Sequence, residues 1–108
     1  MEVKSFDKEG VLVFQVGGEI NISTSPELKK QFEKQSSKKT VVDLTSVSYI
    51  DSSGLATLVE ILKRTKSQAG NLVLSGLSEK VRSLFEITKL DKLFQVSPTQ
   101  DDAVNRIK

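Results

Sequence analysis

The 108-residue sequence contains no cysteine and no histidine. Their absence excludes disulfide bonds, thiolate nucleophiles, the usual zinc sites and every catalytic triad that uses an imidazole base. A serine nucleophile would then need a different base such as lysine, and no recognisable motif places a lysine near Ser53. We therefore expect the chain not to be an enzyme.

Long apolar runs are also missing. Stretches such as VLVF at residues 11–14 fall far short of the roughly 20 residues that a membrane span needs, and the N-terminal MEVKSFDKEG lacks the apolar core of a signal peptide. The 16 basic and 14 acidic residues are mixed along the chain, and the few aromatic residues lie at core-like positions. We therefore expect a cytoplasmic protein that binds neither a membrane nor a nucleic acid.

The chain does contain alternating strand and helix patterns, in the order β-β-α-β-α-β-α-β-α. This order predicts a single domain over residues 1–108 with an α/β fold, in which an N-terminal hairpin edges a mixed sheet covered by about four helices. The expected strands span residues 3–6, 11–16, 40–44, 72–74 and 93–96. Gly17 and Gly18 should break the second strand, and residues 45–49 should form a loop.

Helix starts are marked by capping residues. Thr24 and Glu27 have the spacing of a capping box, although Ser25 would be the cap if Pro26 took the first helical position. Ser78 should cap a later helix. The expected buried faces follow helical spacing, and the members are Leu28, Phe32, Leu55, Leu58, Val59, Leu62, Val81, Leu84, Phe85, Thr88, Ala103, Val104 and Ile107. On the solvent side, Glu60 and Arg64 are spaced for an ion pair.

The stretch DSSG at residues 51–54 has two interpretations. Asp and Ser before an amphipathic run are typical N-cap residues, whose oxygens accept hydrogen bonds from the unpaired amides of the first turn. The same helix end also tolerates a phosphate, because it presents free N–H groups and a partial positive charge. A phosphorylated serine here would add a charge of about −1.5 to −2. A docked apolar partner would reject that charge although the fold would accept it.

Gly54 is unusual within this stretch. Glycine weakens a helix by up to about 1 kcal/mol relative to alanine. A glycine is useful where another backbone approaches closely, and that backbone belongs either to a partner or to a neighbouring strand of the same chain. The sequence leaves both explanations open.

Three ordered segments resemble the signature of STAS domains, specifically of bacterial anti-sigma factor antagonists. The first is VGGEI at residues 16–20, followed by a capped helix. The second joins VVDL at 41–44 to VSYIDSSGL at 47–55, and the third is LDKLF at 90–94. The resemblance covers nearly the whole chain and extends to the order of strands and helices.

The resemblance implies a partner-switching protein. The unphosphorylated antagonist would bind an anti-sigma factor that is a serine kinase and would thereby free the sigma factor. The kinase would phosphorylate the second serine of the motif, Ser53, and a PP2C-type phosphatase would reverse this step. Asp51 would orient the loop, and the other partner-binding residues implied are Ser52, Gly54, Leu55, Asn21, Ser23 and Thr24. ATP and magnesium would belong to the kinase, so no cofactor or metal is expected in this chain.

One residue departs from the family pattern. Family members often carry aspartate at the position of Asn21, and asparagine keeps the hydrogen-bonding side chain but loses the charge. This puts in doubt a role for residue 21 in positioning a metal–nucleotide group. Asn21 could equally be a turn residue that bonds its own backbone.

Two other functions remain possible from the sequence. Asp43 ends the apolar strand VVDL as the acceptor of a phospho-aspartate receiver does, but the acidic cluster that would hold magnesium is missing, because Asp7 and Glu9 lie in the hairpin turn. Alternatively, the chain is a STAS scaffold without a phospho-switch, as in a stressosome or beside a lipid-transport complex.

Overall fold

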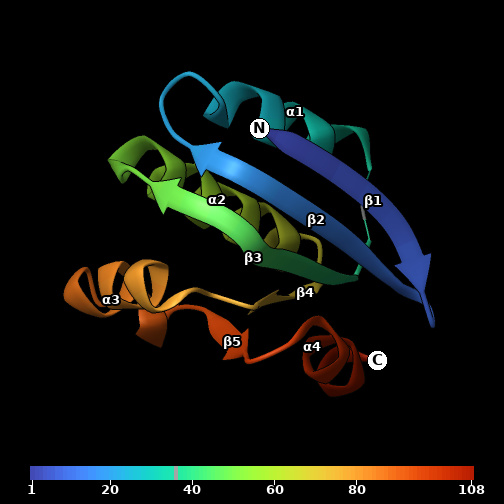
Figure 1. The fold of residues 1–108 in the computed structure, drawn as a ribbon. Helices are drawn as coiled ribbons and strands as arrows, with labels where there is room; N and C mark the ends of the chain where they lie inside the picture. The colour runs from blue at the N-terminus through green and yellow to red at the C-terminus, as the bar shows by residue number, and fades with distance from the viewer. Residues whose placement is uncertain (36) are drawn as a thin grey trace.

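In the computed structural model, which describes residues 1–35 and 37–108, a five-stranded sheet has the strand order β1-β2-β3-β4-β5. β1 (Glu2–Lys8) and β2 (Val11–Ile20) form an antiparallel hairpin, and β3 (Lys39–Ile50), β4 (Asn71–Ser75) and β5 (Gln95–Ser97) follow in parallel. The helices are α1 (Ser25–Lys34), α2 (Ser52–Ser67), α3 (Glu79–Ile87) and α4 (Gln100–Ile107), with a 3₁₀ turn η1 (Leu90–Lys92) after α3. Figure 1 shows the mixed α/β fold with the predicted hairpin edge.

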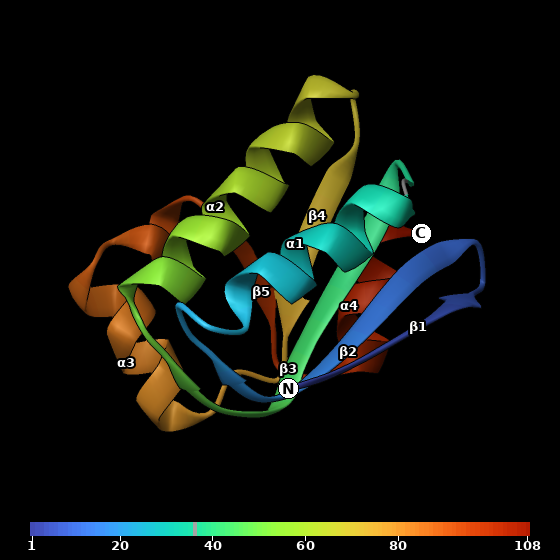
Figure 2. The same cartoon turned by 90° about the horizontal axis from the view of Figure 1, so that it is seen from above.

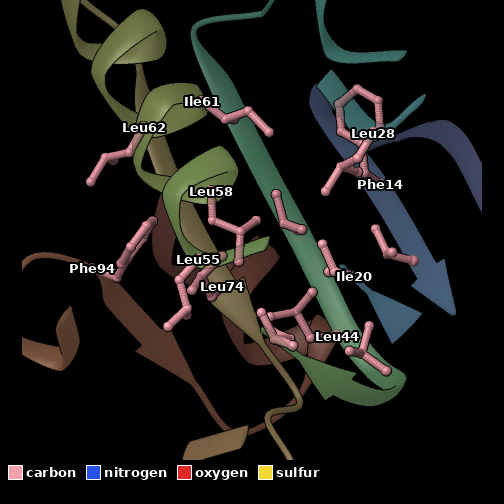
Figure 3. Packing of buried hydrophobic residues seen from close by; sticks show 14 of the residues in the cluster. Phe14, Ile20, Leu28, Leu44, Leu55, Leu58, Ile61, Leu62, Leu74 and Phe94 are labelled. Carbon is pink, nitrogen blue, oxygen red and sulfur yellow. The ribbon is translucent and has the colours of Figure 1, made fainter. Parts of the chain in front are cut away.

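The helices divide unequally between the two faces of the sheet. α1, α2 and α3 cover one face, and α4 lies on the other (Figure 2). Side chains alternate between these faces because successive residues of a strand point in opposite directions. Phe14 and Val42 thus face the large core, whereas Val13 and Val41 face α4. Figure 3 shows the large core, in which Leu58 and Ile61 of α2 pack with residues of the sheet.

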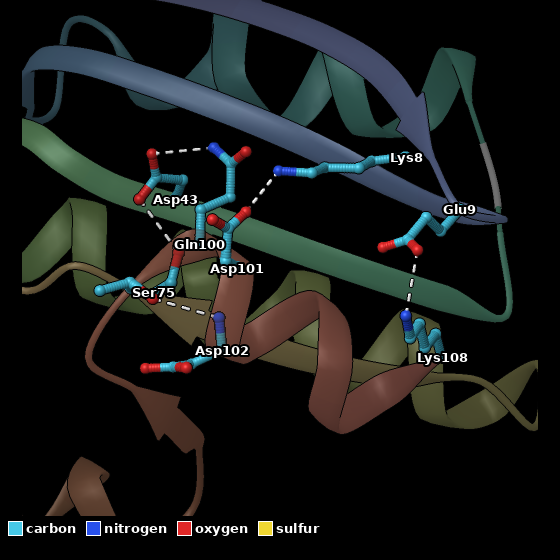
Figure 4. Close-up of polar contacts among 9 residues, drawn as sticks. Lys8, Glu9, Asp43, Ser75, Gln100, Asp101, Asp102 and Lys108 are labelled. Atoms are coloured by element: carbon cyan, nitrogen blue, oxygen red, sulfur yellow. Dashed lines mark hydrogen bonds and ion pairs between the residues drawn. The ribbon is translucent and has the colours of Figure 1, made fainter.

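The smaller core beneath α4 is reinforced by polar contacts. Its apolar members are Val11, Val13, Val41, Val73, Ala103, Val104 and Ile107. Gln100 donates a hydrogen bond of 3.3 Å to Asp43, Lys8 pairs with Asp101, and Lys108 pairs with Glu9 at 3.0 Å (Figure 4). α4 is therefore held at both ends by groups of the sheet and of the hairpin turn.

Two predictions about the strands were wrong, and the two errors are linked. Gly17 and Gly18 do not end β2, which continues to Ile20 through shifts in its pairing register with β3. Residues 45–49 are not a loop, because β3 continues beside this extension as far as Ile50. Hydrogen bonds between the two extensions, together with burial of Val47, stabilise the longer strands. As a result, β2 and β3 end side by side.

Several smaller predictions also fail. Thr24 precedes α1 but makes no side-chain cap bond with it, and Ser25 is a buried residue within the helix. Glu60 pairs with Lys29 of α1 at 3.0 Å instead of with Arg64. Thr88 is exposed, and β5 spans Gln95–Ser97 rather than residues 93–96.

The predicted cap of α3 is confirmed, and α4 has a similar cap. Ser78 accepts a hydrogen bond from the amide of Val81 at 3.3 Å, and Thr99 accepts one from the amide of Asp102 at 3.1 Å. Among the helices in the described part of the chain, none is long and apolar enough to cross a membrane.

Candidate functional site

The candidate site lies where the adjacent parallel strands β2 and β3 end. Ile20 pairs with Ile50 in the last register position, and the arrowheads of the two strands lie side by side in Figure 1. The loop of residues 21–24 and the DSSG stretch then follow these two strand ends. The amide of Asp51 donates a hydrogen bond to the carbonyl oxygen of Ile20 at 3.1 Å, which joins the two segments. The structure thus brings together the two segments that the sequence predicts to form one site.

Asp51 holds this site with both oxygens of its carboxylate. It is the N-cap of α2 and has an extended backbone, with φ −96° and ψ −177°. Its Oδ1 accepts from the amide of Gly54 at 2.8 Å, as an N-cap side chain should. Its Oδ2 accepts from the amide of Ile22 at 3.1 Å, in the loop between β2 and α1. One side chain therefore caps the helix and fixes the neighbouring loop.

Asn21 shapes the same loop from within. Its Oδ1 accepts from the amides of Ser23 at 2.9 Å and Thr24 at 3.1 Å, which is the Asx-turn arrangement. The Thr24 hydroxyl accepts from the Asn21 amide at 2.8 Å and donates to the carbonyl of Glu19 at 2.8 Å. These bonds need an amide or carboxylate oxygen but no charge, so asparagine satisfies the turn. They leave Ile22 on the outside, where it is 73% exposed.

Ser52 and Ser53 are the first two residues of α2. Ser52 is exposed, and Ser53 is half-buried and retains accessible surface. The amide of Leu55 donates the first hydrogen bond of the helix to the backbone carbonyl oxygen of Asp51 at 3.0 Å. The amide of Gly54 donates to the side-chain carboxylate of Asp51. The amides of Ser52 and Ser53 have no acceptor among the described residues. Two free donors thus remain beside the two hydroxyl groups.

Gly54 lies beneath these serines and is buried. A Cβ atom at this position would lie 2.4 Å from the carbonyl oxygen of Ile20 and 2.8 Å from Cγ2 of Ile50. The close backbone is therefore the end of β2 in the same chain, and internal packing is enough to explain the glycine. Leu55, only 7% exposed, belongs to the large core. Gly54 and Leu55 were both expected in the contact patch. Both are buried, and they hold the start of α2 in place by packing against the sheet and the large core.

The sequence interpretation missed a groove beside the serines. A hollow of about 470 Å³ lies between the start of α2 and α3, and its lining includes Tyr49, Ser52, Lys80 and Ile87. We call it the α2–α3 groove. Its residues come from three elements, and the only local signal is that Tyr49 and Ile87 are large apolar residues outside the predicted buried faces.

Asp43 offers no accessible acceptor for a phosphoryl group. It is 8% exposed, and its Oδ1 accepts from the hydroxyls of Thr45 at 2.6 Å and Ser75 at 3.0 Å. Its Oδ2 accepts from Gln100 of α4. Within the described ranges, no group of three or more acidic side chains could hold a metal ion. Asp43 joins β3, β4 and α4, and this structural role disfavours the receiver interpretation.

Comparison with known proteins identifies the family. The STAS domain family model matches residues 5–103. The chain belongs to the STAS domain family. The anti-sigma-B factor antagonist of Listeria monocytogenes is 36% identical over 105 residues, which cover 94% of this chain and 91% of the relative. These matches confirm the predicted resemblance to the anti-sigma factor antagonist branch of the family.

Solved structures agree with the fold of this STAS domain. An anti-sigma factor antagonist from Mycobacterium paratuberculosis superposes with a TM-score of 0.88 at 29% identity, covering 98% of this chain and 92% of the other. The phosphorylated form of the Bacillus cell fate determinant SpoIIAA superposes with a TM-score of 0.75 at 16% identity, covering 99% and 100% of the two chains. At that identity the second match concerns the fold alone.

Proposed function

We propose that this STAS domain is an anti-sigma factor antagonist controlled by phosphorylation of Ser53. The unphosphorylated form binds an anti-sigma factor serine kinase and frees the sigma factor, and phosphorylation ends this binding. A PP2C-type phosphatase restores the active form. The observation that carries the proposal is the position of Ser53, which is accessible at the second residue of α2. It follows two residues after Asp51, whose carboxylate binds the amide of the exposed Ile22.

The physics of the helix start supports such a switch. A phosphoryl group on Ser53 would lie near the free amides of the first turn and the positive end of the helix dipole, so the fold would tolerate it. A partner that covers Ile22 would have to remove water from the phosphate, and an unpaired buried charge is costly. Phosphorylation would therefore weaken docking without unfolding the domain.

The partner assignment is supported by the related proteins. Curated relatives that match this chain over more than nine-tenths of their own length are anti-sigma-B factor antagonists. ATP and magnesium would be supplied by the kinase, so this chain needs to present only a hydroxyl and a docking surface. In the same way, Ser52, Ser23 and Thr24 belong to the proposed contact surface, with Asn21 and Asp51 holding the loop in place.

Incubation with the cognate anti-sigma factor kinase and MgATP, followed by mass spectrometry, tests the modification. We expect one phosphoryl group, mapped to Ser53. Ser52→Ala is the matched control and should still be modified, whereas Ser53→Ala should not. Modification of Ser52 instead of Ser53 would show that the proposal names the wrong serine. No modification at all would favour the alternative of a STAS scaffold without a phospho-switch.

Binding to the same kinase in the presence of ADP tests the consequence. Ser53→Asp should weaken binding about 100-fold or more, because a buried charge without a partner costs several kcal/mol in an interface. The asparagine of Ser53→Asn has nearly the same shape as the aspartate of Ser53→Asp but no charge. Ser53→Asn should therefore bind much more tightly than Ser53→Asp. Equal affinities for the two variants would contradict the charge-exclusion mechanism.

A further inference from the structure

The α2–α3 groove combines a hollow shape with exposed apolar side chains. Its volume of about 470 Å³ falls in the range of ordinary binding pockets. Its lining includes Ile87, which is 79% exposed, and Tyr49, which is 43% exposed, together with the leucines Leu55 and Leu84. Scattered exposed apolar residues are normal in proteins, but a group of them around a hollow indicates a binding surface.

The groove also carries a positive charge. Among the described residues, Lys80 is the only basic one in the groove lining. Its Nζ lies 5.7 Å from the centre of the Tyr49 ring, within cation–π distance. The acidic residue in the lining is Asp51, and both of its oxygens already accept hydrogen bonds from backbone amides. The remaining free charge in the groove is thus the Lys80 ammonium, which favours a carboxylate on whatever binds there.

The groove is continuous with the proposed switch. Ser52 lies in its lining, and Ser53 is the next residue of α2. A second copy of this chain is a poor occupant, because a symmetric contact through this groove would bring the same face, and with it the other Lys80, towards Lys80. A different protein is a better occupant if it carries an apolar segment that fits the hollow and an acidic residue on this segment that pairs with Lys80.

We infer that the α2–α3 groove seats an apolar segment of the anti-sigma factor kinase and that Lys80 pairs with a carboxylate on this segment. The inference rests on the proposed function and extends it, because it adds Tyr49, Lys80 and Ile87 to the docking surface. A phosphoryl group on Ser53 would then lie at the edge of an apolar contact, which increases the cost of docking onto the phosphorylated form.

Calorimetric titration of the kinase in the presence of ADP tests this surface. Ile87→Glu and Lys80→Glu should each weaken binding by about tenfold or more, as expected for residues central to an interface. The matched controls are Leu93→Glu and Lys92→Glu, which change an exposed apolar residue and an exposed lysine outside the groove lining. Both controls should stay within about twofold of the parent, as is usual for residues outside an interface.

Further variants separate the possible outcomes. Lys80→Met keeps the length of the side chain without its charge, so we expect it to bind less tightly than the parent and more tightly than Lys80→Glu. Parent-like binding by Ile87→Glu and Lys80→Glu, with binding still lost in Ser53→Asp, would overturn the groove assignment and leave the proposed function intact. Failure of the parent itself to bind would overturn both. A dimer of the parent in sedimentation that Ile87→Glu dissociates would assign the groove to a second copy instead.

Discussion

The starts of α2 and α4 look alike in sequence but differ in their surroundings. Each has an N-cap side chain that accepts a hydrogen bond from the amide three residues later: Asp51 from Gly54, and Thr99 from Asp102. Each is also tied to another element. Around α4 these ties involve charged or polar side chains, namely Asp101 with Lys8 and Gln100 with Asp43.

Around α2 the tie runs to a backbone amide, that of Ile22, and the free surface beside it is apolar. The difference teaches that a capping motif sets only where a helix begins. The start of α4 uses its polar groups to anchor the helix on the sheet. The start of α2 uses its cap carboxylate within the chain and leaves two serines, with their free amides, near an apolar surface, which is the arrangement that a charge can switch.

The largest expected effect on stability is at Gly54. Gly54→Ala would place a Cβ atom 2.4 Å from the carbonyl oxygen of Ile20, and a backbone atom cannot move away easily. The overpacking should lower the free energy of unfolding by about 2–3 kcal/mol, more than the gain of up to about 1 kcal/mol in helix propensity.

Gly17→Ala is the matched control for this change. Its Cβ would make only an ordinary contact, at 3.5 Å from Cβ of Ser46. Urea unfolding of both variants measures the difference. An unfolding free energy of Gly54→Ala equal to that of the parent would mean that α2 does not pack against β2 as described.

A smaller effect is expected from the two caps. Thr99→Ala removes one cap bond and should cost about 1 kcal/mol, whereas Asp51→Ala removes the cap and the bond to Ile22 and should cost about 2 kcal/mol. Asp51→Asn should lie between these values, because its one carbonyl oxygen can still accept from Gly54.

Urea unfolding again gives these free energies. The comparison of the two helix starts would be wrong if Asp51→Ala and Thr99→Ala had equal costs. Kinase binding adds a second measurement: Asp51→Asn should weaken it by releasing the loop, whereas Thr99→Ala should leave it unchanged.

The smallest effect concerns pH at the start of α4. The hydrogen bond from Lys8 and its positive charge lower the pKa of Asp101 below its ordinary value of 3.8. The unfolded chain therefore binds a proton at this residue more readily than the folded one does. The stabilisation is complete above the ordinary value and is lost as the pH falls through the lowered pKa.

Asp101→Asn should thus be slightly less stable than the parent at pH 7, and the difference should shrink as the pH falls below the ordinary value. Urea midpoints of the two proteins across this range provide the check. A difference that grew on acidification would contradict the assigned direction of the pKa shift. Ser53→Asn should show no such pH-dependent difference, because no titrating group is removed.

Local signals in the sequence correctly predicted several helix starts and an inner helix face. Asp51 caps α2, Ser78 caps α3, and Ala103, Val104 and Ile107 of α4 face inward. These features depend on residues within one or two helical turns, so their sequence pattern is sufficient. The capping box of Thr24 and Glu27 failed because the Thr24 hydroxyl bonds to Asn21 and Glu19 before the helix begins.

The failures nearer the site have a different origin. The extensions of β2 and β3 stabilise each other through pairing, so neither strand alone indicates where it ends. The α2–α3 groove combines residues from β3, α2 and α3, and no local pattern relates Tyr49 to Lys80 or Ile87.

The sequence by itself determined the order of strands and helices, their apolar faces and the start of α2 at Asp51, because hydrophobic periodicity and capping act over short distances along the chain. Only the tertiary structure decided what the second oxygen of Asp51 binds, why residue 54 is glycine and which apolar residues flank the serines. Each of these depends on how closely the ends of two strands and a later helix approach one another, and such distances are set by packing of the whole domain.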